Sequence, residues 1–168
     1  MYQEARTVLE VGGKLNSAGV HKEISLVDIF KDDFIKSVSK DVGGYVFGKC
    51  KDNKRNKNNI EYISYLIYDI DKADRDIYDE VVKAMEEANI YMLIHTTHSH
   101  DPKNNAFKYR VIIDVDGQIP VNDYKGFYEY VLKKIPLLYE NRQWLDDSAT
   151  AISRFFYKPS FHPDRAES

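Results

Sequence analysis

The chain has 168 residues, of which 43% are hydrophobic and 30% are charged, as is usual for soluble globular proteins. Its single cysteine, Cys50, excludes an internal disulfide and a cysteine-based zinc site and favours a reducing compartment. No apolar run approaches the ~20 residues that a membrane-spanning helix needs, and no signal-type apolar core follows the N-terminus. We therefore expect a cytoplasmic protein with no membrane partner. The net charge of -3 does not by itself indicate nucleic-acid binding.

Residues 1–59 are expected to form an N-terminal α/β extension. Residues 25–38 have apolar side chains near helical spacing after a candidate cap, Ser25, and residues 45–47 favour a short strand. The following loop, 49–59, is polar and basic. Its Lys54, Arg55 and Lys57 predict contact with a nucleic-acid backbone, although such a run is also typical of a solvated loop.

The clearest pattern of elements begins at residue 60. Strands are predicted at 60–71, 90–97, 107–115 and 153–158, and helices at 74–88 and 122–135. We expect Asp116-Gly117 to end the third strand in a turn, and Pro136 to stop the second helix.

The order of these elements is β-α-β-β-α-β, the RRM-like or ferredoxin-like arrangement. The sequence thus predicts an α+β fold, with an antiparallel sheet that has both helices on one face and the other face free for a ligand. We interpret 1–168 as a single domain with its core at 60–158. Because many unrelated functions use this fold, function has to be argued from the sites.

Two carboxylates end the first predicted strand of the core, Asp69 and Asp71. Residues i and i+2 of a strand point to the same face, where two carboxylates repel each other unless a cation lies between them. Hard divalent cations such as Mg²⁺ prefer oxygen ligands of this kind. The alternative is that Asp69 only ends the strand and Asp71 caps a turn.

Histidines gather at the end of the second predicted strand, at His95, His98 and His100. Strand alternation would put His98 and His100 on one face and His95 on the other, which argues against a simple three-histidine metal site. A histidine beside the two acids is expected instead to bind a nucleotide phosphate. Polar strand-end residues would give the same pattern.

Cations on the two later strands are candidate phosphate ligands. Lys108 and Arg110 share one face of the 107–115 strand, and Arg154 and Lys158 share one face of the 153–158 strand. Arginine is suited to bidentate phosphate contacts. Exposed cations on ordinary strands would look the same.

An acidic pair, Asp146-Asp147, precedes the last predicted strand. Either carboxylate is a candidate third metal ligand, and a helix cap is the alternative reading. Asp114 and Asp116 are weaker candidates because Gly117 favours a turn there.

Taken in order, these motifs resemble those of the archaeo-eukaryotic primase superfamily, in particular its phage and plasmid primases and primase-polymerases. The resemblance covers roughly residues 43–160. Asp69-Ile70-Asp71 matches the DxD motif, His100 or His98 the small-x-His motif, and Asp147 or Asp146 the late acid. Lys108-Tyr109-Arg110, the segment from Arg154 to Pro159, and the basic stretch from Lys54 to Asn59 match the remaining motifs.

The resemblance implies template-directed, metal-dependent nucleotidyl transfer in the DNA replication of a phage or mobile element. Asp69, Asp71 and Asp147 are then the expected catalytic residues, and these with Asp146 the expected ligands of Mg²⁺ or Mn²⁺. The expected nucleotide-binding residues are His98, His100, Lys108, Arg110, Arg154 and Lys158.

The implied partners are single-stranded DNA and NTPs or dNTPs. Family members are often fused to a helicase, and no GxxxxGK[ST] loop occurs in this chain. The resemblance therefore implies either a stand-alone small primase or the N-terminal domain of a longer primase–helicase, with the helicase in cis or in trans.

Two other functions are compatible with the sequence. A rolling-circle initiator endonuclease would use His98 and His100 as metal ligands and a tyrosine from the 122–135 helix as nucleophile, but Ser99 stands where that motif has a hydrophobic residue. A non-catalytic origin-binding or partner-binding domain is the other alternative.

Overall fold

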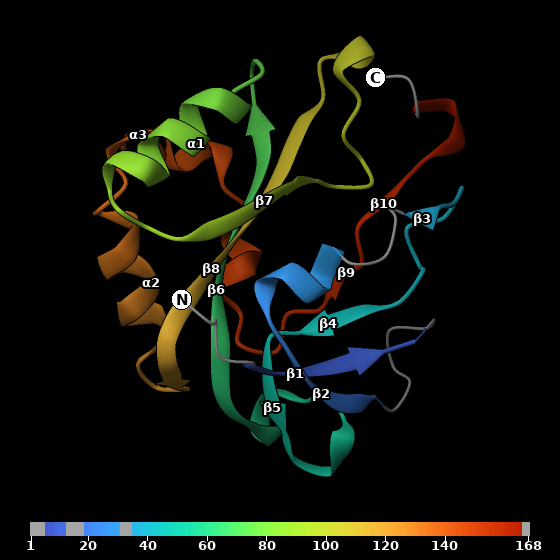
Figure 1. Ribbon diagram of the computed structural model, residues 1–168, viewed down its shortest axis with the longest axis vertical. Helices are drawn as coiled ribbons and strands as arrows, with labels where there is room; N and C mark the ends of the chain where they lie inside the picture. Colours follow the sequence, from blue (N-terminus) through green and yellow to red (C-terminus); the bar gives the residue numbers. More distant parts are fainter. Residues whose placement is uncertain (1–5, 13–18, 31–34, 166–168) are drawn as a thin grey trace.

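The structure is a computed structural model that describes residues 6–12, 19–30 and 35–165. It has the predicted mixed α+β architecture (Figure 1). The helices are α1 (Tyr78–Glu87), α2 (Tyr124–Leu132) and α3 (Pro136–Glu140). The strands are β1 (Arg6–Val11), β2 (Val20–Ile24), β3 (Ile35–Lys36), β4 (Gly44–Val46), β5 (Gly48–Cys50), β6 (Ile60–Ala73), β7 (Met92–Thr96), β8 (Phe107–Pro120), β9 (Phe156–Tyr157) and β10 (Ser160–Phe161).

The central sheet has the strand order β5-β6-β8-β7, and each of its neighbouring pairs is antiparallel. Strand β6 is buried almost continuously from Ile63 to Ile70, which explains its apolar sequence. Leu66, Tyr68 and Ile70 belong to the large core that also contains α1 and α2 side chains. The alternate residues Tyr65 and Ile67 pack in a second cluster on the opposite face.

The helices cover one face of the central sheet (Figure 1). Helix α1 buries Val81 and Met85, one helical turn apart. The predicted helix boundaries were too generous, because Asp76 accepts a hydrogen bond from the Tyr78 main-chain N–H at 3.0 Å and α1 starts only there. Pro136 follows α2 as expected, and it also begins α3, a position that suits its missing N–H.

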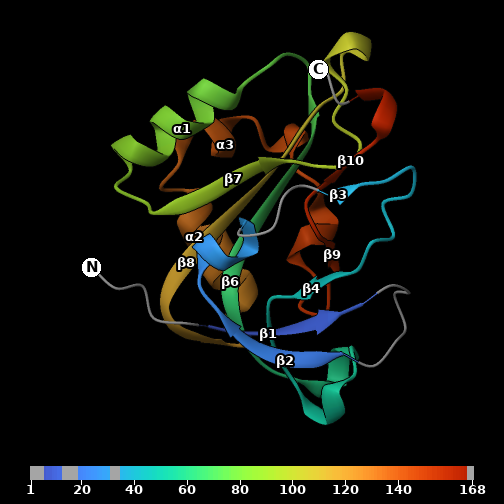
Figure 2. The ribbon, with the colours of Figure 1, turned by 45° about the vertical axis from the view of Figure 1, so that its right-hand side comes forward.

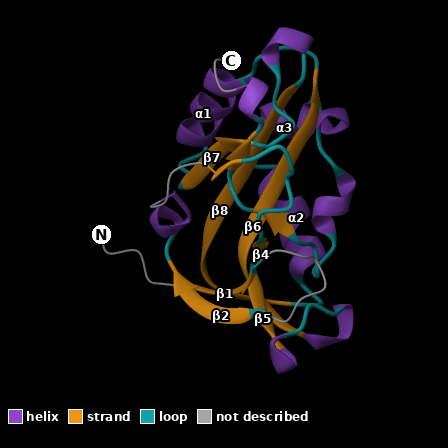
Figure 3. Ribbon diagram, turned by 90° about the vertical axis from the view of Figure 1, so that its right-hand side faces the viewer, coloured by secondary structure: helices purple, strands orange, loops and turns teal. Residues whose placement is uncertain are grey.

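A second sheet, of order β2-β1-β4-β9, lies on the side of the central sheet away from α1 and α3 (Figures 1 and 2). Figure 3 shows β1 and β2 crossing the lower ends of β6 and β8. Val8 and Phe156 of this sheet pack with Tyr65 and Ile67 of β6, and the Tyr65 hydroxyl donates to the Ile24 main-chain oxygen at 2.7 Å. The face that the sequence predicted to be free for a ligand is therefore partly covered.

The predicted fourth strand, 153–158, does not join the central sheet. Only residues 156–157 are extended, as β9, and they pair with β4. The edge beside β6 is occupied by β5 instead. The order β6-β8-β7 still matches the first three strands of the ferredoxin-like core.

Two further expectations were wrong. The 25–38 helix is reduced to a 3-10 turn, Leu26–Phe30, its candidate position Phe34 lies outside the described residues, and β1 and β2 make the extension largely β-sheet. Asp116-Gly117 does not end the third strand, since β8 continues to Pro120. The β6–β8 register shifts at this point, and Gly117 has a φ of 115°.

Candidate functional site

Three polar side chains lie directly beside one another across the central sheet. In the strand register, Asp69 of β6 is opposite Arg110 of β8, and Arg110 is opposite His95 of β7. Cross-strand partners share a face, and this is the face away from the helices. All three are almost fully buried, with exposed fractions of 3%, 8% and 5%.

Arg110 donates two parallel hydrogen bonds to the Asp69 carboxylate. Its Nε lies 2.7 Å from Oδ1 and its Nη2 lies 3.1 Å from Oδ2. A third nitrogen, Nη1, donates to the Tyr157 main-chain oxygen at 3.1 Å, and the guanidinium lies 4.8 Å from the ring centre of Phe156. Arg110 therefore connects the DxD strand to the C-terminal segment.

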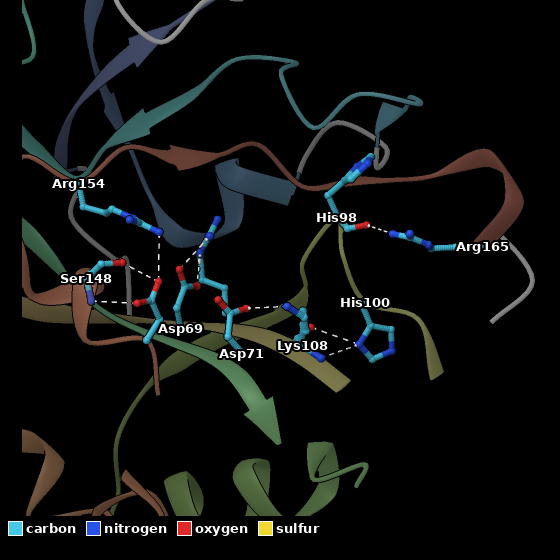
Figure 4. A network of polar contacts seen from close by, with 10 residues as sticks. Asp69, Asp71, His98, His100, Lys108, Ser148, Arg154 and Arg165 are labelled. Carbon is cyan, nitrogen blue, oxygen red and sulfur yellow. Dashed lines mark hydrogen bonds and ion pairs between the residues drawn. The ribbon is translucent and has the colours of Figure 1, made fainter. Parts of the chain in front are cut away.

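Asp71 is more accessible than Asp69. Its side chain is 35% exposed, and Oδ1 lies 3.8 Å from Lys108 Nζ. Figure 4 shows Asp69 and Asp71 close together on β6, with Lys108 on the far side of Asp71. The structure thus places the two acids on one face, as predicted, and leaves Asp71 open to a ligand.

The acids open onto a cavity of about 290 Å³, which is near the lower end of the size range for small-molecule sites. Segments that are distant in the sequence form its wall. The lining residues are Lys40, Arg55, Asp69, Asp71, His95, Thr97, His98, Ser99, Arg110, Arg154, Phe155, Tyr157, Lys158 and Pro159.

His95 is a cavity residue that the sequence interpretation assigned to the other face. Burial, reinforced by the charge of Arg110, lowers the pKa of His95 to about 3, against the opposing effect of its hydrogen bond with the Thr96 main chain. His95 Nδ1 lies 2.6 Å from the Thr96 oxygen. At neutral pH His95 is therefore an uncharged imidazole beside Arg110.

The other two histidines, His98 and His100, lie in different places. Strand β7 ends at Thr96 and a turn follows, in which the His100 N–H donates to the Thr97 oxygen at 2.9 Å, so strand alternation does not apply to them. His98 lines the cavity and its Nδ1 lies 3.1 Å from the Ser160 hydroxyl.

His100 does not line the cavity. Its Nδ1 accepts a hydrogen bond from the Lys108 main-chain N–H at 3.1 Å, and its ring lies 5.0 Å from that of Tyr109, which belongs to the helix-side core. Its position does not support the predicted phosphate contact. Burial lowers the pKa of both His98 and His100.

Of the two candidate third acids, the structure brings Asp146 to the DxD strand. Leu145 forms a β-bridge with Ile70, and the Asp146 N–H donates to the Asp69 main-chain oxygen at 2.8 Å. Burial raises the pKa of Asp146, but hydrogen bonds from Ser148 and the charges of Arg154 and Lys72 outweigh burial and lower it overall.

Asp147 has different neighbours from Asp146. It is exposed, and its charge acts on Tyr128 and Arg142, of which Tyr128 lies in the helix-side core. The position of Asp147 therefore gives no support to its predicted role. Asp114 and Asp116 line a different surface hollow, beside α2.

Arg154 and Lys158 both line the cavity. Arg154 Nη2 lies 3.2 Å from Asp146 Oδ2, and Figure 4 shows Arg154 reaching toward the region of Asp69 and Ser148. Lys158 forms an ion pair with Glu10. The cations of the predicted basic loop do not lie together. Arg55 lines the cavity, whereas Lys54 and Lys57 are exposed outside it.

Asp69 and Asp71 offer carboxylate oxygens of the kind that Mg²⁺ and Mn²⁺ prefer. Throughout residues 6–12, 19–30 and 35–165, no three histidine, cysteine, aspartate or glutamate side chains are grouped to hold a metal ion. Mg²⁺, however, is commonly held by one or two carboxylates together with substrate phosphates and water. Asp71, with Asp69 beside it, supplies such oxygen donors.

Two cavity residues escaped the sequence interpretation. His95 was missed because the register of β7 on β8 is not visible in the sequence, and the assumed strand was too long. Lys40 lies in a bend between β3 and β4, where no motif marks it.

Comparisons with known proteins agree with this fold. The VapE N-terminal domain family matches the chain over residues 28–167. The AEP domain of the primase-polymerase (PrimPol) of cyanophage S-2L matches with a TM-score of 0.50 at 9% identity, over 97% of this chain and 77% of that one; at this identity the likeness shows a shared fold. No curated protein matches the chain. None of the described helices is long and apolar enough to cross a membrane.

Proposed function

The chain belongs to the VapE N-terminal domain family, and we propose that it is a primase-type nucleotidyltransferase domain acting in replication. Its substrates are NTPs or dNTPs and a single-stranded DNA template. The observation that carries the proposal is the cavity that Asp69 and Asp71 share with Arg154, Lys158 and His98. Carboxylates facing cations across a small cavity suit a metal-bound polyphosphate.

Asp71 and Asp69 would hold Mg²⁺ or Mn²⁺. The main-chain N–H of Asp146 is hydrogen-bonded to the main-chain oxygen of Asp69. When bound, the ion lowers the pKa of an attacking 3′-hydroxyl and stabilises charge on the triphosphate. The protein itself mainly positions charges in such a reaction. Arg154 and Lys158 contribute cations to the phosphate chain, and His98 provides a polar contact at the cavity rim.

The contacts of Arg110 do not favour its predicted role as a phosphate ligand. Its guanidinium already donates to both Asp69 oxygens and to Tyr157, and it is 8% exposed. We therefore assign it as a positioning residue, which orients the Asp69 carboxylate and fixes the C-terminal segment against β8. Lys108 is not among the residues that line the cavity, and its Nζ lies 3.8 Å from Asp71 Oδ1.

The rolling-circle endonuclease is less compatible with this geometry. Tyr124 and Tyr128 of α2 are buried in the helix-side core, and Tyr130 is exposed next to Lys134. None of these three tyrosines is among the residues that line the cavity.

The test is nucleotide incorporation on single-stranded DNA, with and without a primer, in the presence of Mg²⁺ or Mn²⁺. We expect Asp71→Asn to lower the rate by at least ~100-fold, which corresponds to about 2.7 kcal/mol of activation free energy. The matched control is Asp116→Asn, which removes the same charge from an exposed position outside the cavity.

Equal loss in both variants would contradict the assignment of the cavity. A wild-type protein that forms no phosphodiester bond with either metal would contradict the enzyme itself and would favour a non-catalytic binding domain. Covalent attachment of the protein to a nicked 5′ end would instead support the function of a rolling-circle endonuclease.

A further inference from the structure

A second hollow, of about 730 Å³, lies on the surface beside α2. The end of β8, the segment that precedes β7 and residues of α2 form its wall, and apolar side chains such as Ile119 and Val131 line it. Two of its tyrosines are largely exposed, Tyr91 at 64% and Tyr130 at 58%. Tyrosine is enriched in protein–protein interfaces, so this surface has the composition of a docking site.

The hollow also has two carboxylates without a charged partner. Asp116 and Asp123 are exposed, and neither forms an ion pair with any residue in the described part of the chain. Lys134 Nζ lies 5.1 Å from the ring centre of Tyr130, an example of the attraction between an ammonium group and a tyrosine ring. The hollow therefore suits further lysines, because their aliphatic stems cover apolar surface while their ammonium groups reach carboxylates.

The loop 51–57, between β5 and β6, has the complementary charge. Its exposed lysines are Lys51, Lys54 and Lys57. None of them forms an ion pair within residues 6–12, 19–30 and 35–165. The main-chain oxygen of Asn53 accepts a hydrogen bond from the Gly19 N–H at 2.9 Å, and Arg55 Nη1 donates to the Ser153 main-chain oxygen at 3.0 Å. These contacts fix the loop in advance, which lowers the entropy that binding would cost.

The loop and the hollow lie at the same end of the central sheet. In the register of β6 on β8, Tyr62 is opposite Pro120. Tyr62 follows the loop closely in the sequence, and Pro120 lines the hollow. Figure 1 shows the turn before β6 and the end of β8 in the lower part of the view. A two-fold axis at this end can pair the loop of each copy with the hollow of the other, because such an interface is self-complementary.

We propose that two copies of this chain associate through these surfaces, and that the lysines of loop 51–57 in each copy bind Asp116 and Asp123 of the other. Charge dominates the contact, so it forms at low salt and weakens as salt screens it. The contact lies outside the cavity of the DxD acids. Nucleotide incorporation by dilute, monomeric protein therefore does not depend on it.

Sedimentation equilibrium of the whole chain measures the association. We expect a monomer–dimer equilibrium whose dissociation constant rises at least ~10-fold between about 0.05 M and about 0.5 M NaCl. Two variants each reverse the charge of one surface, Lys54→Glu plus Lys57→Glu and Asp116→Lys plus Asp123→Lys. Each variant alone should be monomeric, because like charges then meet at both contacts of the dimer. An equimolar mixture of the two should dimerise, since opposite charges meet again at both contacts.

The control for net charge is Lys36→Glu plus Lys103→Glu. It changes two exposed lysines outside the loop and the hollow, and it should dimerise like the wild type. Tyr91→Ser leaves the charge unchanged and should raise the dissociation constant, because it removes an exposed ring from the hollow. Thermal unfolding of each variant checks that it is folded.

A wild type that stays monomeric at low salt and millimolar concentration would overturn the proposal. A mixture of the two reversed variants that stays monomeric would overturn it as well, and assemblies larger than a dimer would overturn the two-fold contact. If the wild type is monomeric and Lys54→Glu plus Lys57→Glu weakens binding to single-stranded DNA, the loop is assigned to nucleic acid instead.

Discussion

At the scale of single residues, the DxD acids differ in what surrounds them. Asp69 is 3% exposed and is gripped by a buried arginine, whereas Asp71 is accessible and only loosely paired. The sequence predicts the shared face of these acids, since strand alternation requires it. It does not predict that one acid is buried against Arg110, because this depends on the β6–β8 register.

This difference predicts unequal effects on stability. Asp69→Ala leaves the Arg110 charge buried without its partner and should lower the free energy of unfolding by about 3–5 kcal/mol. Asp71→Ala removes a partly exposed pair and should cost about 1 kcal/mol or less. Urea unfolding of both variants measures this, and equal destabilisation would contradict the structural role of the Asp69–Arg110 pair.

The lowered pKa of His95 predicts that the stability of the protein depends on pH. Its pKa in the folded protein is about 3, against ~6.5 in an unfolded chain. Between these values the unfolded state binds a proton that the folded state does not, so the free energy of unfolding falls as pH decreases through this window. The contribution is up to about 1.4 kcal/mol per pH unit.

The measurement is urea unfolding between pH 7 and pH 4. His95→Gln keeps a neutral side chain with a hydrogen-bond donor, and it should flatten the decline of stability toward acid. The control is His162→Gln, which changes a half-buried histidine of the C-terminal segment. A His95→Gln variant as acid-sensitive as the wild type would refute the buried, neutral state of His95.

The choice of third acid also belongs to this scale. The sequence offers Asp146 and Asp147 as equals, because adjacent residues in an irregular segment have no periodicity. A main-chain hydrogen bond from Asp146 to Asp69 places Asp146 beside the DxD strand. Such a contact joins residues that are 77 positions apart (146 − 69), and one sequence alone does not reveal it.

At the scale of elements, the long strands and helices could be predicted and the short strands could not. Strand β6 has a continuous apolar run that only a strand buried on both faces needs. Strand β9 has two residues, too few for any pattern, and its pairing with β4 is a long-range contact. The fourth strand was therefore assigned to the wrong sheet.

The close approach of β4 and β9 predicts a sensitive glycine. A Cβ at Gly44 would lie 2.3 Å from the Phe156 main-chain oxygen, so Gly44→Ala must push β9 away. We expect a loss of about 1–3 kcal/mol in the free energy of unfolding. Because β9 also carries the Tyr157 oxygen that binds Arg110, nucleotide binding should weaken too.

The matched substitution is Gly126→Ala in α2. A Cβ there meets nothing within 4 Å, and alanine is the better helix former by up to about 1 kcal/mol. This variant should be slightly more stable than the wild type and bind nucleotide normally. Equal behaviour of the two alanine variants in chemical unfolding would contradict the tight packing of β4 against β9.

At the scale of the whole molecule, the cavity is assembled from both ends of the chain. The ferredoxin-like core supplies the acids and His95, the extension supplies Lys40 and Arg55, and the C-terminal segment supplies Arg154 and Lys158. The sequence motifs identify most of these side chains one at a time. Their convergence depends on how the second sheet lies across β6, and this is why Lys40 and the separate position of Arg55 could not be foreseen.

The central claim is that the carboxylates of this cavity bind a metal ion together with a nucleotide. Equilibrium dialysis of labelled NTP, with Mn²⁺ and with EDTA, tests it most directly. Mn²⁺ should tighten NTP binding at least ~10-fold in the wild type and in Asp116→Asn, and should have little effect in Asp71→Asn, which lacks the accessible carboxylate. Affinity that does not respond to Mn²⁺ in the wild type, or that responds equally in Asp71→Asn, would contradict the account.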